Sequence, residues 1–176
     1  TSHPKDATEE LFRAMAECEK VERHIHLPLQ SGSDRILRAM NRVYDSEKYR
    51  SLVELARSLM PDIVITTDII VGFPGETAED FEDTMRMVER VRYDAMFTFI
   101  FSPREGTPAA KMPDDTPRSE KLERFDRLLE LANRISAEKH AEYLGKTVRV
   151  LVDGESGDEL FPLTSRTKGG RLVHLR

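Results

Sequence analysis

The chain has 176 residues, of which 39% are hydrophobic and 34% charged, with a formal net charge of −5 and a single cysteine, Cys18. This length allows one domain of good size, or one domain with a small appendage. No apolar run approaches the roughly 20 residues that cross a bilayer, so we expect no membrane role. One cysteine excludes an internal disulfide and an all-cysteine metal cluster within the chain, and it favours a cytoplasmic setting.

The first half of the chain begins with alternating helix and strand patterns. Thr8 is placed to cap a first helix, and "HIHLPLQ" (24–30) has the composition of a short apolar strand. Ser33 and Ser46 are placed to cap the next two helices, because a Ser or Thr side chain can accept a free amide of the first turn.

The alternation continues with "IVITTDIIVGF" (63–73) as a strand, a capping box at Thr77–Asp80 that opens a helix, and "AMFTFIF" (95–101) as a third strand. Strands separated by helices predict a parallel α/β sheet, and their Ile, Val and Phe content indicates that both faces are covered. Three strand–helix units would form half of a barrel with an open edge.

Each of these strands ends in a polar residue followed by Gly or Pro. Ligands of barrels and open parallel sheets lie at the carboxyl ends of the strands. We therefore interpret "GFPGE" (72–76) as a ligand-facing loop whose glycines allow close approach of the backbone.

A linker (106–117) precedes a long amphipathic segment. Thr116 is the expected cap of this helix, Pro117 its first residue and Gly145 the residue just past its end. At a rise of 1.5 Å per residue the helix would be about 40 Å long.

The last 30 residues have the pattern of short strands. "TVRVLVDGES" (147–156) alternates, with Val148, Val150 and Val152 expected to point inward, and "SRTKGGRLVHL" (165–175) predicts a hairpin that turns at Gly169-Gly170. These strands would begin a small β-barrel. Because the chain has no initiator Met and stops within the last predicted strand, we expect it to be a piece of a longer protein.

The end of the chain is basic, whereas the chain as a whole is acidic. Residues 164–176 contain no acid and carry Arg166, Lys168, Arg171 and Arg176. Such a patch indicates a contact with a polyanion, although composition alone favours an ordinary solvated hairpin.

Four motifs, "TSHP", "HIHLPLQSGSDRILRAMNR", "TDIIVGFPGET" and "FTFIFSPREGTPAA", resemble the MiaB-type tRNA methylthiotransferases, a branch of the radical S-adenosylmethionine (radical SAM) enzymes. The resemblance covers nearly the whole chain. It implies the second half of a radical SAM barrel at 1–110, a linker and long helix at 111–145, and part of an RNA-binding TRAM domain at 146–176.

The resemblance also implies cofactors. Such enzymes use S-adenosylmethionine and two 4Fe-4S clusters, one of them held by a CxxxCxxC motif. This chain has none of those cysteines, and Cys18 matches no cluster motif, so we expect it to hold no metal and to be inactive alone.

By resemblance, the S-adenosylmethionine site includes Gln30 after one strand, Arg42 twelve residues later and Asp68 in the next strand. An amide and a carboxylate suit ribose hydroxyls, and an arginine suits the α-carboxylate. Alternatives remain open: Gln30 as a loop cap, Arg42 as a solvated helix end, and Asp68 as a structural partner of Arg42. Ser31 and Gly72 are included as neighbouring cofactor-binding candidates.

Other polar residues have less definite roles. Glu76 lies one residue late for the wider family's pattern, so we interpret it as a loop or helix-start residue. His24 and His26 are expected to line the barrel rather than bind metal. Arg104 and Thr107 lie at a strand mouth and could face either adenosine or stabilise a turn.

The function implied is the addition of a 2-methylthio group to N6-isopentenyladenosine, next to the anticodon of tRNA, by a cytoplasmic monomer. Arg166, Lys168 and Arg171 are then candidates for contacts with tRNA phosphates. Three alternatives stay open: action on threonylcarbamoyladenosine, an RNA-binding module only, and a βα-barrel enzyme that uses "GFPGE" as a phosphate loop. The lack of a Lys or Arg near that loop in the sequence argues against the last.

Overall fold

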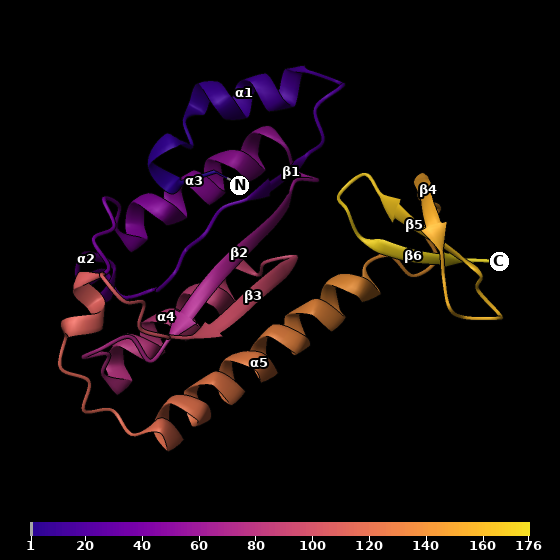
Figure 1. Cartoon of the computed structure of the whole chain (residues 1–176). Helices are drawn as coiled ribbons and strands as arrows, with labels where there is room; N and C mark the ends of the chain where they lie inside the picture. The colour runs from indigo at the N-terminus through magenta and orange to yellow at the C-terminus, as the bar shows by residue number, and fades with distance from the viewer. Residues whose placement is uncertain (1) are drawn as a thin grey trace.

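The computed structural model describes residues 2–176 and contains two sheets joined by a long helix (Figure 1). The order of the elements is η1 (Pro4–Asp6), α1 (Glu9–Glu17), β1 (His24–His26), α2 (Asp34–Ala39), α3 (Ser46–Leu59), β2 (Val64–Val71), α4 (Ala78–Val91), β3 (Ala95–Ile100), η2 (Pro108–Lys111), α5 (Arg118–Ala141), β4 (Val150–Glu155), β5 (Leu163–Thr167) and β6 (Leu172–Leu175).

The first sheet is parallel, with strand order β1-β2-β3, which confirms the α/β prediction. The strand expected over 24–30 is shorter than predicted: β1 ends at His26, and only Gln30 pairs again, with Ile69. Pro28 lies between, and proline has no amide hydrogen to donate to a neighbouring strand.

The helices begin near their predicted caps. Thr8 accepts from the Leu11 amide, Ser33 from the Ile36 amide, and Thr77 and Asp80 form the predicted capping box. The predicted cap of α3, Ser46, was wrong by one residue. Asp45 accepts from the Lys48 amide, and Ser46 is the first helical residue. An ionised carboxylate is as good a cap as a hydroxyl, so the two adjacent candidates could not be separated by type.

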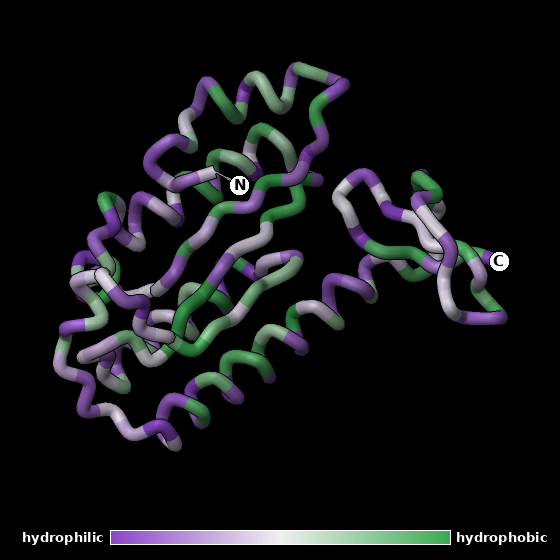
Figure 2. Tube along the Cα trace, viewed as in Figure 1, coloured by the Kyte–Doolittle hydropathy of each residue, from purple (hydrophilic) through white to green (hydrophobic). Residues whose placement is uncertain are grey.

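Only one face of the parallel sheet is covered in this chain. Ile65, Ile69 and Val71 are buried in a core to which α1, α3, α4 and α5 all contribute. On the other face Phe97 and Phe99 of β3 are 55% and 50% exposed, and Figure 2 shows hydrophobic stretches along β2 and β3. The expectation that both faces are covered was therefore wrong for residues 2–176: helices cover one face, and the other carries exposed phenylalanines beside polar side chains of β1 and β2.

Helix α5 lies along the sheet and joins its core through Leu128, Leu131 and Ile135. It is shorter than expected at both ends. Pro117 occupies the cap position without a side-chain hydrogen bond, so Thr116 does not cap the helix, and the last turn ends at Ala141 rather than next to Gly145. Its 24 residues correspond to about 36 Å.

The second sheet is antiparallel, in the order β4-β5-β6. The predicted hairpin is confirmed, but its turn is centred one residue earlier, on Lys168 and Gly169, since the Gly170 amide donates to the Thr167 carbonyl. The inward orientation expected of the valines was wrong for Val148 and Val152, which are 39% and 51% exposed, because three strands form an open sheet rather than a closed barrel.

The hairpin turn packs against the amino ends of β1 and β2. A Cβ atom added to Gly169 would lie 2.3 Å from Val64 Cγ2, and one added to Gly170 would lie 3.9 Å from His24 Nδ1. The backbone at Gly169 passes directly over Val64, so a residue with a side chain would clash at this position. The hairpin turn thus lies at the opposite end of the parallel sheet from the strands' carboxyl ends (Figure 1).

Candidate functional site

A pocket of about 540 Å³ lies toward the carboxyl ends of β2 and β3. Polar groups and an apolar wall both contribute to it. It is lined by Gln30, Arg42, Asp68, Ile70, Phe99, Ile100, Phe101, Ser102, Arg104, Thr107 and Ala109. Gln30, Arg42 and Asp68 were singled out in the sequence, and the fold brings all three to this pocket.

Gln30 is held by its backbone. Its amide donates to the Asp68 carbonyl at 2.8 Å, and its carbonyl accepts from the Ile70 amide at 2.9 Å. The residue has a φ of 70°, in the left-handed region. A non-glycine residue there costs roughly 1–2 kcal/mol and persists where the surroundings enforce it. Two backbone hydrogen bonds to β2 provide that enforcement.

Arg42 has unused hydrogen-bonding capacity. Its Nη2 donates to Gln30 Oε1 at 3.3 Å, whereas its Nε is buried and has no hydrogen-bond partner within residues 2–176. A buried donor without a partner costs about 1–3 kcal/mol, so this nitrogen suits an acceptor brought by a ligand.

Asp68 projects from the uncovered face of β2. Its Oδ2 lies 3.4 Å from His26 Nε2, so its observed neighbour is the His26 imidazole rather than Arg42. His24 and His26 both approach Thr66 Oγ1, at 3.4 and 2.9 Å, and face the same side of the sheet, as expected of barrel-lining residues. Burial, followed by the charge of His26, lowers the pKa of His24.

The other two cofactor-binding candidates lie outside the pocket. Ser31 is buried, accepts from the Ser33 amide at 3.2 Å and lies 3.4 Å from Thr84 Oγ1. Gly72 has a φ of 70°, and a Cβ added there would meet Lys121 Cδ at 2.7 Å. Gly72 therefore accommodates α5, so the close backbone approach expected of this loop is made by the chain itself.

A buried ion pair that the sequence did not indicate fixes the loop 72–76. Arg124 Nη1 of α5 lies 2.9 Å from Glu76 Oε1, and the Gly72 amide donates to Glu76 Oε2 at 3.1 Å. Glu76 and Arg124 are only 4% and 5% exposed. Burial raises the pKa of the Glu76 carboxyl, and the hydrogen bond from Arg124 opposes that rise.

The structure corrects one argument against a phosphate loop, namely that no Lys or Arg lies near this loop. Lys121 and Arg124 do lie beside "GFPGE", although both come from α5 and are distant in sequence. Their charges are already engaged, because Lys121 pairs with Asp114, and Arg124 pairs with Glu76 and Glu120. No cation beside this loop is left free within the described chain.

A second carboxylate, Asp80, ties α2 to α4. Burial would raise the pKa of Asp80, but hydrogen bonds from Arg35, Ser33 and Thr77 outweigh burial and hold it well below its usual range. This cluster fixes the chain that follows Gln30, since Ser33 Oγ donates to Asp80 Oδ1 at 2.6 Å.

The lowered pKa of Asp80 predicts an acid-sensitive contribution to stability. Because the folded-state pKa lies below the unfolded one, the contribution is complete above the unfolded value of about 3.9 and is lost as the pH falls below it. We expect Asp80→Asn to lower the free energy of unfolding at pH 7 by about 1–3 kcal/mol. In urea titrations at several pH values, the difference from wild type should shrink between about pH 5 and pH 2; a constant difference would contradict this assignment.

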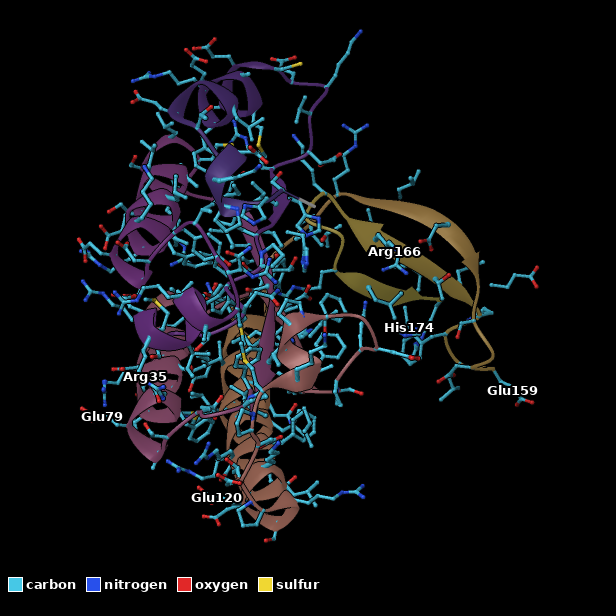
Figure 3. All side chains as sticks on the ribbon, turned by 60° about the vertical axis from the view of Figure 1, so that its left-hand side comes forward. Arg35, Glu79, Glu120, Glu159, Arg166 and His174 are labelled. Atoms are coloured by element: carbon cyan, nitrogen blue, oxygen red, sulfur yellow. The ribbon has the colours of Figure 1, made fainter. Side chains whose placement is uncertain are left out.

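The three RNA-binding candidates differ in their surroundings. Arg166 Nε pairs with Asp153 Oδ2 at 2.8 Å, and Figure 3 shows Arg166 on the second sheet, far from Arg35. Arg171 is largely covered: it lies 3.6 Å from Asp94, 3.0 Å from His140 Nε2 and 5.0 Å above the Tyr143 ring. Lys168 is exposed, so the structure does not bring the three together as one free patch.

Metal ligands are not grouped in the described part of the chain. No set of three or more His, Cys, Asp or Glu side chains in residues 2–176 is arranged to hold a metal ion, and Cys18 is an exposed free thiol.

Comparison with known proteins gives consistent matches. A family model described as the radical SAM superfamily matches residues 1–88. The "tRNA-2-methylthio-N(6)-dimethylallyladenosine synthase" of Thermoanaerobacter sp. (strain X514) is 55% identical over 174 residues, which cover 99% of this chain and 37% of that protein. Proteins of the same name from Acetivibrio thermocellus and Clostridium novyi are 55% and 53% identical, again over 99% of this chain, and over 36% and 38% of their own lengths. The chain therefore spans little more than a third of these curated relatives.

Proposed function

Because the chain belongs to the radical SAM superfamily, we propose that the pocket at the carboxyl ends of β2 and β3 binds S-adenosylmethionine. One observation carries this proposal: Gln30, Arg42 and Asp68, an amide, a guanidinium and a carboxylate, line one pocket.

The chemistry of the pocket fits this ligand. Asp68 and the Gln30 amide oxygen can accept from ribose hydroxyls, and Arg42 can donate to the α-carboxylate. Ile70, Phe99 and Phe101 offer apolar surface to the uncharged parts of the molecule. When bound, S-adenosylmethionine supplies adenosyl and methyl groups; the chain's own residues orient it and provide ionic partners.

An iron–sulfur cluster does not fit the residues present. Such clusters are held by several thiolates, and the chain has one cysteine, Cys18, which is exposed and lies outside the pocket. We infer that this chain contributes part of an S-adenosylmethionine pocket and none of the cluster ligands.

We further propose that the protein acts in 2-methylthio modification of N6-dimethylallyladenosine in tRNA, because the relatives named above carry that activity in their names. In this proposal residues 1–110 supply part of the barrel, residues 111–145 the connection, and residues 146–176 part of a TRAM domain that contacts RNA. A cytoplasmic monomer is proposed on the same basis. No helix in residues 2–176 is long and apolar enough to cross a membrane.

A chimera tests this function. The segment of the Thermoanaerobacter relative that matches this chain should be replaced by the chain and expressed in a strain lacking its own methylthiotransferase. At 55% identity, we expect the chimera to restore the 2-methylthio group on dimethylallyladenosine, as measured by mass spectrometry of digested tRNA. A chimera that folds, holds its clusters and leaves this nucleoside unmodified would contradict the proposal. A methylthio group on threonylcarbamoyladenosine would favour that substrate, and tRNA binding without modification would favour an RNA-binding module.

The basic residues give a separate prediction for RNA binding. Lys168 is exposed, whereas Arg171 is held by Asp94, His140 and Tyr143. In filter binding of tRNA over a salt series, Lys168→Ala should lower the salt slope by about one unit, since each released phosphate contact contributes about that much. Arg171→Ala should leave the slope nearly unchanged. Equal slopes for Lys168→Ala and wild type would mean that the hairpin does not contact RNA.

A further inference from the structure

The Asp68 carboxylate in the proposed S-adenosylmethionine pocket has one polar neighbour within residues 2–176. His26 Nε2 lies 3.4 Å from Asp68 Oδ2, and the other carboxylate oxygen, Oδ1, makes no hydrogen bond or ion pair in this part of the chain. His26 itself does not line the pocket, whereas Asp68 does. An effect of His26 on a ligand in the pocket therefore has to pass through Asp68.

The register of the parallel sheet places His26 and Asp68 on the same face. His26 lies opposite Thr66 of β2, and Asp68 lies opposite Phe97 of β3. Successive side chains of a strand alternate between the two faces, so Thr66 and Asp68, two residues apart, point to the same side. The His26 backbone is also held at this position, because its carbonyl accepts from the Ser2 amide at 2.9 Å. The approach of His26 to Asp68 thus follows from strand pairing.

Thr66 and Phe97 fix the orientation of the His26 ring. Thr66 Oγ1 lies 2.9 Å from His26 Nδ1, and the Phe97 ring meets the imidazole edge to face, with 5.9 Å between the ring centroids. An ionised carboxylate only accepts hydrogen bonds, so a neutral His26 serves both polar neighbours only with its hydrogen on Nε2. Nε2 then donates toward Asp68, and Nδ1 accepts from the Thr66 hydroxyl. These contacts assign the Nε2–H tautomer to His26.

We propose that His26 is a positioning residue of the S-adenosylmethionine site. Its Nε2–H holds one oxygen of the Asp68 carboxylate and leaves the other oxygen for a ribose hydroxyl. A carboxylate that is already oriented loses less side-chain freedom when the ligand binds, and this saving appears as affinity. The inference rests on the function proposed above and deepens it, since it names a residue outside the pocket that prepares the pocket for its ligand.

Titration calorimetry with S-adenosylmethionine tests this role. His26→Phe keeps an aromatic ring against Phe97 and removes the donor to Asp68. We expect it to weaken S-adenosylmethionine binding by roughly 2- to 12-fold, because fixing one freely rotating side chain on binding lowers affinity by about that factor. His26→Gln keeps an amide donor near the Nε2 position and should bind S-adenosylmethionine nearly as well as wild type.

Two comparisons separate positioning from a general disturbance of the sheet. In an Asp68→Ala background no carboxylate remains to be oriented, so His26→Phe should cause no further loss of affinity. His24→Phe is the matched control, because His24 lies on the same strand and face and approaches Thr66 Oγ1 at 3.4 Å, but not Asp68. It should bind S-adenosylmethionine like wild type. The same loss with and without Asp68, or equal losses in His24→Phe and His26→Phe, would overturn the proposal.

A measurement without ligand distinguishes this inference from the proposed function. Nitrogen-resolved NMR of the histidine rings at about pH 8.5, where an ordinary imidazole is neutral, should show His26 in the Nε2–H form, with its signals assigned by their loss in His26→Gln. The Nδ1–H form would place a lone pair against the Asp68 carboxylate and would overturn the positioning role, even if S-adenosylmethionine binds. If His26 shows the Nε2–H form and wild type binds no S-adenosylmethionine, the proposed function fails while the orientation of Asp68 by His26 stands.

Discussion

Replacing Glu76 by alanine is expected to destabilise the chain by about 3–5 kcal/mol, because Arg124 would then remain buried without its buried carboxylate partner. The Gly72 amide would also lose its acceptor, Glu76 Oε2. Chemical denaturation followed by circular dichroism measures the loss. The signal to follow is the unfolding of the parallel sheet and its helices, because Arg124 belongs to α5, which packs on that sheet.

Glu120→Ala provides the matched control. Glu120 pairs with the same arginine, but its side chain is 45% exposed, so its removal should cost no more than about 1 kcal/mol. The double variant Glu76→Leu/Arg124→Met removes both buried charges and should recover much of the loss. Equal effects of Glu76→Ala and Glu120→Ala would contradict the structural role assigned to the buried pair.

Replacing Asp68 by asparagine is expected to weaken S-adenosylmethionine binding by roughly 10- to 150-fold, the equivalent of about 1.5–3 kcal/mol for a hydrogen bond to a charged group. The change keeps the shape of the side chain and removes the charge next to His26. Because Asp68 is half-buried and its observed neighbour, His26, is also partly exposed, the thermal stability should change little. Titration calorimetry combined with a thermal melt measures both quantities.

Glu79→Gln is the control for Asp68→Asn, since Glu79 is exposed on α4 and lies outside the pocket. It should bind S-adenosylmethionine like wild type. If Asp68→Asn binds equally well while remaining folded, Asp68 is a structural carboxylate, the alternative left open by its sequence.

The resemblance to the radical SAM enzymes predicted that Gln30, Arg42 and Asp68 belong to one site, and the fold brings all three to one pocket. The exact neighbours of these three residues could not be predicted from the sequence. Gln30 has a left-handed backbone, so the chain turns and Ser31 faces Thr84 of α4 instead of the pocket. Sequence adjacency gives no information on such a change of direction.

The role of Glu76 depended on contacts that sequence spacing does not encode. Its partner Arg124 is 48 residues away, and their meeting requires the angle at which α5 docks on the sheet. The same holds for Arg171: its basic type suggested RNA, yet the hairpin packs so that it meets Asp94 and Tyr143. Short-range patterns such as the Thr77–Asp80 capping box were predictable because both partners lie within one turn.

Separate titrations of the chain with S-adenosylmethionine and with inorganic phosphate, the ligand type of the alternative phosphate-loop enzyme, test the central claim most directly. We predict one saturable site for S-adenosylmethionine, weakened in Asp68→Asn and unchanged in Glu79→Gln, and no comparable site for phosphate. An absence of S-adenosylmethionine binding by the folded chain, or tighter binding of phosphate, would contradict the assignment of the pocket formed by Gln30, Arg42 and Asp68.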